Sequence, residues 1–268
     1  MIPKIIHYCW FGGNPLPELA QKCIASWEKF CPDYEIKEWN ESNFDVNCCE
    51  YVKEANKTKK WAFVSDYARI KILYDSGGLY FDTDVELISN LKNIIEKGPF
   101  MGFEDDMQYT VAPGLGLGVT PGLPLYKDIL DLYNNQHFLH DDGTINYTTI
   151  VVYTTNILKK YGLIKKHGIQ YIGGVYIYPQ EYFCPMNFNT GEVTITNKTV
   201  SIHHYSSSWY TEEEKKYNIF GQKMRSVFGI RIGNSIERIY SLPYRVLRKI
   251  DQKGLVGAFK FGIKKLFN

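Results

Sequence analysis

The chain has 268 residues, of which 44% are hydrophobic and 15% aromatic, so it can bury the core of one large globular domain. It has no uninterrupted apolar run of about 18 residues and no charged N-terminal region followed by a long apolar one, which disfavours a membrane-spanning helix and a signal peptide. The formal net charge is only +2 and no nucleic-acid-binding motif accompanies the basic residues, so nucleic acid is not an expected partner.

The hydrophobic pattern predicts a β-α-β opening. Strands are expected at residues 2–10 and 34–39, and a helix between them at 16–30. The later elements follow in order: helices at 46–56 and 60–76 with Gly77 as the stop, a strand at 79–82, strands at 100–103 and 111–120, helices at 123–136 and 147–161, and a strand at 194–203. This alternation predicts an α/β fold with a largely parallel sheet, whose ligands lie beyond the carboxyl ends of the strands.

The charge is unevenly placed along the chain. From Lys215 to Asn268 there are 13 Lys and Arg residues against only Glu237 and Asp251, a local charge of +11. Basic and apolar residues alternate there, which is typical of an amphipathic segment on an anionic membrane surface, although a solvated helical cap on the domain is the alternative. We therefore expect a catalytic or binding domain at 1–212 and a basic helical appendage at 213–268.

The six cysteines form no C-x-x-C pair, which indicates reduced thiols in a cytoplasmic protein.

The run Asp82-Thr83-Asp84 places two carboxylates at the end of a predicted strand. Residues i and i+2 of an extended backbone point to the same face, so both carboxylates can converge on one hard divalent cation. An arbitrary D-x-D sequence is more often a turn or a helix cap. The preceding Gly77-Gly78 and Tyr80-Phe81 favour a metal site here.

Three further clusters carry polar groups that a core would not choose. In His7–Gly13, Trp10 can stack on a planar base, although core packing is the common role of such an aromatic residue. In Ser65–Arg69, Asp66 and Arg69 share a helical face, either as a site pair or as a solvated salt bridge. His203–Trp209 joins imidazoles, hydroxyls and an indole, which fits a third metal ligand with an anion cradle.

The segment Gly114–Gly118 has the form G-x-G-x-G but lacks the spacing of a dinucleotide-binding motif. It predicts a backbone that closely approaches a ligand or another strand.

The segments Ile2–Gly12, Ser65–Arg69, Gly77–Asp84 and His203–Trp209 occur in the order and spacing of glycosyltransferase family 32, which the chain resembles over about residues 1–210. That family includes bacterial capsular polysaccharide sugar transferases and is similar to the glucosyltransferase domain of the large clostridial toxins. The resemblance implies a GT-A fold, which is Rossmann-like, and a metal-dependent retaining transfer from a nucleotide diphosphate sugar. The implied donor is a UDP-sugar and the implied ion Mn²⁺ or Mg²⁺.

The resemblance also implies roles for individual residues. The implied catalytic residues are Asp66, Arg69, Asp82 and Asp84, and the implied metal ligands are Asp82, Asp84 and His204. The implied contacts to the nucleotide sugar are His7, Trp10, Ser65, Asp66, Arg69, Asp82, Ser207, Ser208 and Trp209.

The expected function is therefore that of a bacterial enzyme of capsule or surface polysaccharide biosynthesis. It would transfer a sugar to a saccharide acceptor carried on a polyprenyl diphosphate, at the inner face of the cytoplasmic membrane. Three alternatives remain: a toxin-like transferase that modifies a protein, a non-catalytic domain that binds a nucleotide sugar or carbohydrate, and a metal-dependent phosphohydrolase. The phosphohydrolase is disfavoured because no further carboxylates are placed for a second metal.

Overall fold

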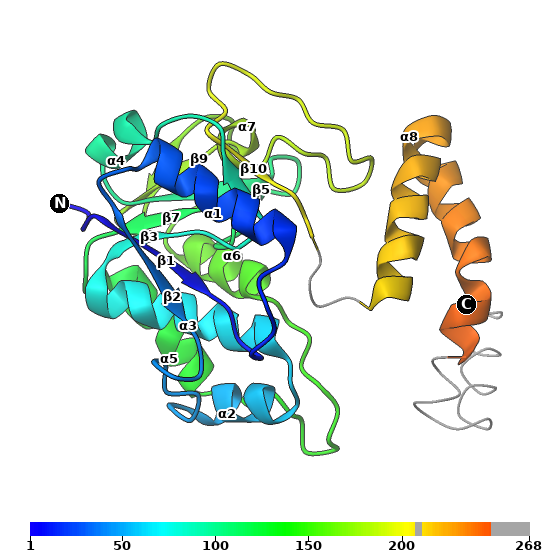
Figure 1. The fold of residues 1–268 in the computed structure, drawn as a ribbon, viewed down its shortest axis with the longest axis horizontal. Coiled ribbons are helices and arrows are strands. Elements are labelled where there is room, and N and C mark those ends of the chain that lie inside the picture. Colours follow the sequence, from blue (N-terminus) through cyan, green and yellow to red (C-terminus); the bar gives the residue numbers. More distant parts are fainter. Residues whose placement is uncertain (207–210, 248–268) are drawn as a thin grey trace. The chain divides into compact units, whose positions relative to one another are not determined.

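The computed structural model describes residues 1–206 and 211–247 and divides them into two compact units (Figure 1). The first unit holds residues 1–186 and 193–206, and the second holds residues 187–192 and 211–247. In the part of the chain that the structure describes, no helix combines the length and apolar character needed to cross a bilayer.

An eight-stranded sheet forms the centre of the first unit, with the strand order β2-β1-β3-β7-β5-β9-β8 and β6 beside β5. The strands are β1 (Ile5–Cys9), β2 (Glu35–Trp39), β3 (Gly78–Tyr80), β5 (Phe100–Asp105), β6 (Thr110–Val111), β7 (Leu117–Val119), β8 (Gln170–Ile172) and β9 (Val175–Tyr178). A separate two-stranded sheet pairs β4 (Val85–Leu87) with β10 (Ser201–His203) in antiparallel orientation.

The predicted α/β class is confirmed, but the sheet is mixed rather than largely parallel. Strand β1 runs parallel to β2 and β3, and β5 runs parallel to β9. Strand β7 is antiparallel to both β3 and β5, and β8 is antiparallel to β9. The chain between β5 and β7 contains no crossover helix, so it reverses direction instead of returning parallel. Hydrophobic periodicity identifies strands but not their direction.

Helices cover both faces of this sheet (Figure 1). One face carries α1 (Glu18–Phe30), α4 (Lys92–Lys97) and α7 (Gln180–Phe183), and the other carries α2 (Glu50–Lys57), α3 (Trp61–Ser76), α5 (Pro124–Asn134) and α6 (Ile150–Lys160). Side chains of β1 alternate between the two cores: Ile6 and Tyr8 lie in one, and Cys9 lies in the other. The five helices predicted before residue 162 correspond to α1, α2, α3, α5 and α6.

Two glycines set the entry of β3 into the sheet. Gly77 ends α3 with φ +64°, as the sequence predicted, and a Cβ there would lie 2.7 Å from Pro121 Cδ. Gly78 has φ +104°, and a Cβ there would lie 2.7 Å from the Ile5 carbonyl oxygen. Gly78 therefore lets β3 lie directly against β1, and Gly77 lets the end of α3 lie against the chain that follows β7, which fixes where the residues after β3 emerge.

The second unit is an antiparallel helical hairpin. Its helix α8 (Glu212–Tyr240) begins at Thr211, whose hydroxyl accepts a hydrogen bond from the Glu214 amide. It is interrupted at Gly229, which has φ 75° and ψ 163°, so the chain folds back on itself (Figure 1). The rings of Phe220 and Tyr240 lie 4.1 Å apart between the two halves.

Candidate functional site

Strands β1 and β3 end at the same edge of the sheet. They run parallel, with Ile6 opposite Leu79 and His7 opposite Tyr80, so the segments that follow them leave the sheet side by side. Trp10 follows β1, and its indole Nε1 donates a hydrogen bond to the Asn14 carbonyl oxygen at 2.6 Å. The Asp82–Asp84 segment follows β3. This placement is the one that the two predicted strand ends implied.

Asp84 is held in its charged form by a fixed set of partners. Its Oδ2 accepts hydrogen bonds from the Ser206 amide at 2.8 Å and from the Ser206 hydroxyl at 2.9 Å, and its Oδ1 lies 3.3 Å from His203 Nε2. Burial opposes ionisation, but His203 and Ser206 outweigh it and hold the pKa of the Asp84 carboxyl well below its usual range. Asp84 is therefore a preoriented anion.

Asp82, Asp84 and His203 together form a candidate cation site. Each offers one ligand atom, and these atoms all lie within 4.8 Å of one another. No other group of three such side chains meets this condition in residues 1–206 and 211–247. Two carboxylate oxygens and an imidazole nitrogen are a donor set that suits Mn²⁺, and hard oxygen ligands also suit Mg²⁺. The residues present therefore fit the ion that the sequence predicted.

The structure changes which histidine belongs to this site. The sequence assigned His204, but His204 Nε2 lies 2.8 Å from Glu86 Oε2, and that carboxylate also pairs with Lys22 at 2.9 Å. Neighbouring side chains on an extended backbone point to opposite sides, so a shift of one residue moves the imidazole to the other face. The register of β10 on β4 places His203 opposite Val85 and beside Asp84. His203 thus replaces His204 as the candidate ligand.

Arg69 connects the cation site to Asp66 on helix α3. Its Nη1 lies 3.0 Å from Asp82 Oδ2 and its Nη2 lies 3.0 Å from Asp66 Oδ1, while Nε donates to the Ser65 carbonyl oxygen at 3.1 Å. Arg69 is only 5% exposed and Asp66 only 9%. A solvated surface salt bridge is thereby excluded, and the guanidinium acts as a buried bridge between two carboxylates.

Burial sets the ionisation of Asp66. It raises the pKa of the Asp66 carboxyl to about 6, although the charge of Arg69 and a hydrogen bond from the Ile150 amide oppose the rise. Ile150 is the first residue of α6, so the positive end of that helix faces the carboxyl. Asp66 therefore lies between a cationic side chain and a helix N-terminus, where it can accept hydrogen bonds from hydroxyl groups.

Gly114 makes room for Asp82. The Asp82 amide donates to the Gly114 carbonyl oxygen at 3.1 Å, and a Cβ at Gly114 would overlap Asp82 Oδ2. In the same segment, a Cβ at Gly118 would overlap the ring of Phe100. The close backbone approach predicted for Gly114–Gly118 is confirmed, and one of the groups approached is a site carboxylate.

His7 supports the fold and offers no free nitrogen to a ligand, which corrects its predicted contact with the nucleotide sugar. It is 1% exposed, its Nδ1 accepts a hydrogen bond from Trp39 Nε1 at 3.0 Å, and its Nε2 lies 3.0 Å from the Gly77 carbonyl oxygen. Desolvation lowers the pKa of His7 to about 4. The neutral imidazole with a proton on Nε2 satisfies both partners.

Replacing His7 with Gln should alter how stability depends on pH. Between pH 6.5 and about 4 the unfolded chain protonates His7 while the folded chain does not, so wild-type stability falls as pH falls, by up to about 3 kcal/mol. The His7→Gln variant lacks this contribution. The free energy of unfolding in urea, measured for both proteins from pH 7.5 to 4, should show a difference that shrinks toward low pH. A difference independent of pH would contradict this account.

Three residues around His203 were not predicted to contribute. The rings of His203 and Tyr205 lie 4.2 Å apart, and Cys184 Sγ lies 3.0 Å from the Tyr205 hydroxyl oxygen. Burial raises the pKa of Glu104, near the end of β5, although the nearby His203 opposes the rise. Cys184 and Glu104 are distant from His203 in sequence, so no local pattern could have brought them to it, whereas Tyr205 is two residues away and belongs to the cluster His203–Trp209.

The remaining predicted residues are placed only in part. Ser65 is half-buried, and its hydroxyl donates to the Trp61 carbonyl oxygen at 3.1 Å. Ser207, Ser208 and Trp209 lie outside the described residues, so their contact with a phosphate stays a prediction.

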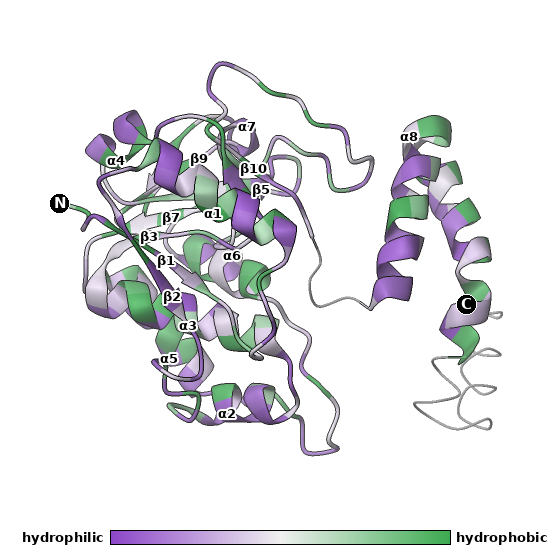
Figure 2. Cartoon of the chain, in the orientation of Figure 1, coloured by the Kyte–Doolittle hydropathy of each residue, from purple (hydrophilic) through white to green (hydrophobic). Residues whose placement is uncertain are grey.

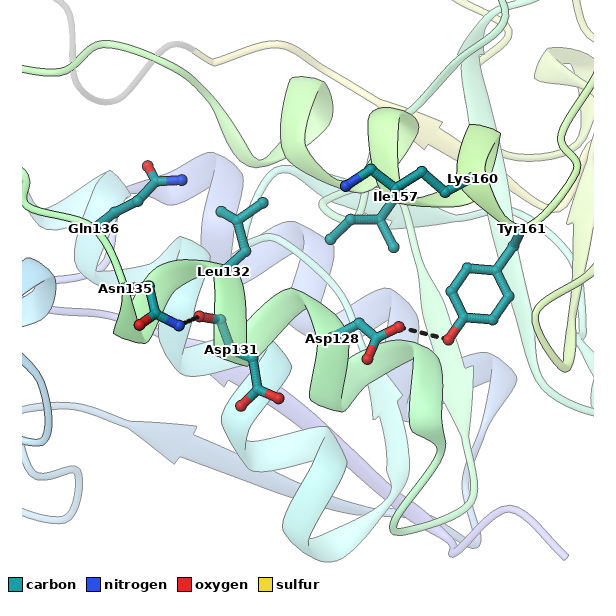
Figure 3. A pocket seen from close by; sticks show the side chains of 8 residues that line it. All are labelled: Asp128, Asp131, Leu132, Asn135, Gln136, Ile157, Lys160 and Tyr161. Atoms are coloured by element: carbon teal, nitrogen blue, oxygen red, sulfur yellow. Dashed lines mark hydrogen bonds between the residues drawn. The ribbon is translucent and has the colours of Figure 1, made fainter.

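A pocket of about 560 Å³ lies elsewhere, between α5 and α6 (Figure 3). Figure 3 shows the Tyr161 hydroxyl pointing to Asp128, to which it donates a hydrogen bond at 2.6 Å. The lining residues are Asp128, Asp131, Leu132, Asn135, Gln136, Ile157, Lys160 and Tyr161. None of them belongs to the site described above.

Comparison with known sequences agrees with the site. Residues 17–101 match the model of the family described as glycosyltransferase sugar-binding region containing DXD motif. The match includes Asp66, Arg69, Asp82 and Asp84, so within these residues it agrees with the resemblance that the sequence indicated. An uncharacterized glycosyltransferase (L373) of Acanthamoeba polyphaga mimivirus is 30% identical over 109 residues, which are 37% of this chain. The chain spans 42% of the length of that relative.

Two solved glycosyltransferases resemble the chain more loosely. The PaToxG glycosyltransferase is 19% identical, with a TM-score of 0.48 over 59% of this chain and 69% of its own. The galactosyltransferase LgtC, in complex with donor and acceptor sugar analogs, is 14% identical, with a TM-score of 0.41 over 78% of this chain and 90% of its own. Likeness at this level bears on neither the donor nor the acceptor of this chain.

Proposed function

We propose that this chain, which carries a DXD sugar-binding region of the glycosyltransferases at residues 17–101, is a metal-dependent transferase of the GT-A type that uses a nucleotide diphosphate sugar. The observation that carries the proposal is the continuous chain of side chains from the cation site to Asp66. Asp82 belongs to both parts, because one of its oxygens pairs with Arg69 and the carboxylate also faces Asp84 and His203. An ion that only stabilised the fold would not need the buried pair of Arg69 and Asp66 beside its site.

The cation site would stabilise the charge of the leaving group. Asp82, Asp84 and His203 would hold Mn²⁺ or Mg²⁺, and a bound cation stabilises the negative charge that develops on a departing nucleoside diphosphate. Ser206 keeps Asp84 oriented, and Tyr80 donates to Asp82 Oδ1 at 3.0 Å. The protein thereby fixes both carboxylates before the donor arrives.

The buried pair on α3 would position the donor sugar. Asp66 would accept hydrogen bonds from sugar hydroxyls, and Arg69 would keep Asp66 and Asp82 in register while placing a permanent positive charge near the diphosphate. Trp10, at the end of β1, would stack on the base, which we propose to be uracil. Because these carboxylates are engaged by a cation or by Arg69, we propose retention by same-face substitution, without a covalent sugar–carboxylate intermediate. The departing phosphate would take the acceptor's proton.

The donor can be tested directly. The full chain, incubated with Mn²⁺ and a panel of UDP-, GDP- and ADP-sugars, should release the nucleoside diphosphate from one UDP-sugar, and EDTA should stop the release. The same sugar should raise the melting temperature, because a ligand that binds only the folded state stabilises it. Failure of every donor in both assays would sink the proposal, and release of phosphate from simple monoesters would indicate a phosphohydrolase instead.

For the acceptor, we propose a saccharide carried on a polyprenyl diphosphate at the inner face of the bacterial cytoplasmic membrane, as in assembly of a capsule or another surface polysaccharide. The basic, apolar C-terminal region supports this location. Radiolabelled donor should label a lipid-linked oligosaccharide fraction and leave a panel of proteins unlabelled. Labelling of protein alone would favour a toxin-like transferase.

The identity of the histidine ligand gives a separate prediction. Replacing His203 with Gln should weaken Mn²⁺ binding by about tenfold or more, since one of three candidate ligands is lost. Replacing His204 with Gln removes a neighbouring imidazole that pairs with Glu86, so it should leave Mn²⁺ binding unchanged. Isothermal titration of both variants decides between the two histidines. The reverse ranking would restore the assignment made from the sequence.

A further inference from the structure

The two halves of α8 pack through one face of each half. A Cβ at Gly233 would lie 2.5 Å from the Arg225 backbone, so the helices approach as closely as glycine allows. Arg225 is buried between them, where it pairs with Glu237 and donates to Asn234 Oδ1 at 3.2 Å. Gly233 and Glu237, one turn apart, therefore mark the inner face of the second half.

The opposite face of this second half is apolar and exposed. Ile232, Ile239 and Val246 recur every seven residues and are 56%, 73% and 45% exposed, and Leu242 lies beside them. With 3.6 residues per turn, these positions lie on the far side of the helix from Gly233 and Glu237. Ser241 keeps right-handed helical angles, and residues 242–247 are helical, so the stripe is continuous.

The hairpin turn extends this apolar surface. Val227, Phe228 and Ile230 surround Gly229 and are each more than half exposed. Figure 2 shows hydrophobic residues along both halves of α8. An ordinary solvated helix carries polar residues on its outer face. The second half of the hairpin carries apolar residues on its outer face, so we expect an apolar partner to cover that face.

Arginines border the stripe with the same spacing. Arg231, Arg238 and Arg245 each precede a stripe residue, so they lie about 100° around the helix from it. Within the described residues, no salt bridge engages these three arginines. An apolar stripe bordered by unpaired cations matches the interface of an anionic bilayer, where apolar side chains enter the acyl boundary and arginines meet lipid phosphates. A partner protein surface would have to supply both an apolar groove and a row of acids.

We propose that this outer face, formed on α8 by Ile232 and Ile239 with Arg231 and Arg238 and on the helical residues 242–247 by Leu242 and Val246 with Arg245, binds an anionic lipid bilayer. The inference goes beyond the proposed transferase activity and does not depend on it, because every residue named lies in the second unit. Lipid binding would place the chain at the surface where a lipid-linked acceptor resides.

The test is co-sedimentation of the full chain with phosphatidylcholine vesicles that contain or lack phosphatidylglycerol. Wild-type protein should bind only the anionic vesicles, and less as salt rises. Replacing Ile232 and Ile239 with Ser, or Arg231 and Arg238 with Glu, should each lower the vesicle partition coefficient by about tenfold or more.

Matched controls lie on the first unit. The pairs Ile164→Ser with Ile195→Ser, and Lys165→Glu with Lys166→Glu, likewise remove exposed apolar and basic side chains and should leave binding unchanged. Circular dichroism checks that the stripe variants remain folded, and donor hydrolysis in solution should be equal in all five proteins. Absence of donor hydrolysis from all five proteins, the wild type included, would contradict the proposed transferase activity. It would leave the lipid proposal unaffected.

Two outcomes would overturn the lipid proposal. The stripe variants could bind anionic vesicles as well as the wild type does, with the same salt dependence. Alternatively, sedimentation velocity without lipid could show a wild-type dimer that the Ile232→Ser and Ile239→Ser changes dissociate, which would assign the face to a second copy of the chain.

Discussion

Replacing Asp84 with Asn should lower metal-dependent release of the nucleoside diphosphate by about a hundredfold or more, the scale on which loss of one oxyanion-stabilising group acts. The amide keeps the size of the carboxylate but carries no charge. Asp84 is the carboxylate of the site whose pKa is held well below normal, so its negative charge is the property that the surrounding residues preserve. The loss should appear in turnover and in Mn²⁺ affinity, which isothermal titration measures separately.

The control for this change is Asp75→Asn on the same unit. Asp75 pairs with Lys71 on the surface of α3 and has no contact with the site, so its replacement should change neither turnover nor Mn²⁺ binding. Melting temperatures of both variants establish that folding is retained. Full turnover in the Asp84→Asn protein would show that the reaction does not need the Asp84 charge, and absence of turnover from the wild type as well would favour a non-catalytic binding domain with a structural ion.

The place of the central carboxylates could be predicted from the sequence because they lie at the end of a predicted strand. The strand before Asp82 and Asp84 ends where β1 also ends, as predicted, but the two carboxylates meet through a turn rather than an extended chain, because the Val85 amide donates to the Asp82 carbonyl oxygen at 3.0 Å. The pairing of Asp66 with Arg69 follows from their helical spacing. What the spacing could not show is that both are buried and that Arg69 reaches Asp82 as well.

The two histidines whose surroundings differ from the sequence prediction share a physical cause. His203 and His204 are adjacent, and only the register of β10 on β4 decides which of them faces Asp84. His7 sits in a polar cluster by sequence, yet the packing of Trp39 and Gly77 around it uses both ring nitrogens. In both cases the deciding partner comes from a distant segment, so neither outcome is encoded in local periodicity.

The helical hairpin illustrates the same limit in the second unit. The sequence shows a basic, apolar region but not its turn, because Gly229 alone marks the point of reversal. Once the chain folds back there, Arg225 is withdrawn to pair with Glu237 while Arg231 and Arg238 stay exposed. Arginines that the sequence alone does not distinguish thus acquire different roles in the structure.

Arg69 gives the second large effect, on stability as well as activity. Replacing it with Met removes the cation between Asp66 and Asp82 and leaves the buried Asp66 and the partly exposed Asp82 without this counter-charge, which should lower the free energy of unfolding by about 3 kcal/mol. Lys71→Met, two positions along the same helix, breaks an exposed pair and should cost less than about 1 kcal/mol. Urea unfolding of the two variants measures the contrast.

Arg69→Lys separates charge from geometry. An ammonium keeps the positive charge, but one nitrogen cannot reproduce the fork that places Nη1 on Asp82 and Nη2 on Asp66, each at 3.0 Å. This variant should recover part of the stability that Met loses, while release of the nucleoside diphosphate stays at least about tenfold below wild type because the carboxylates are no longer held in register. Wild-type turnover with Lys at this position would show that charge alone is sufficient, and the bridging role would then be wrong.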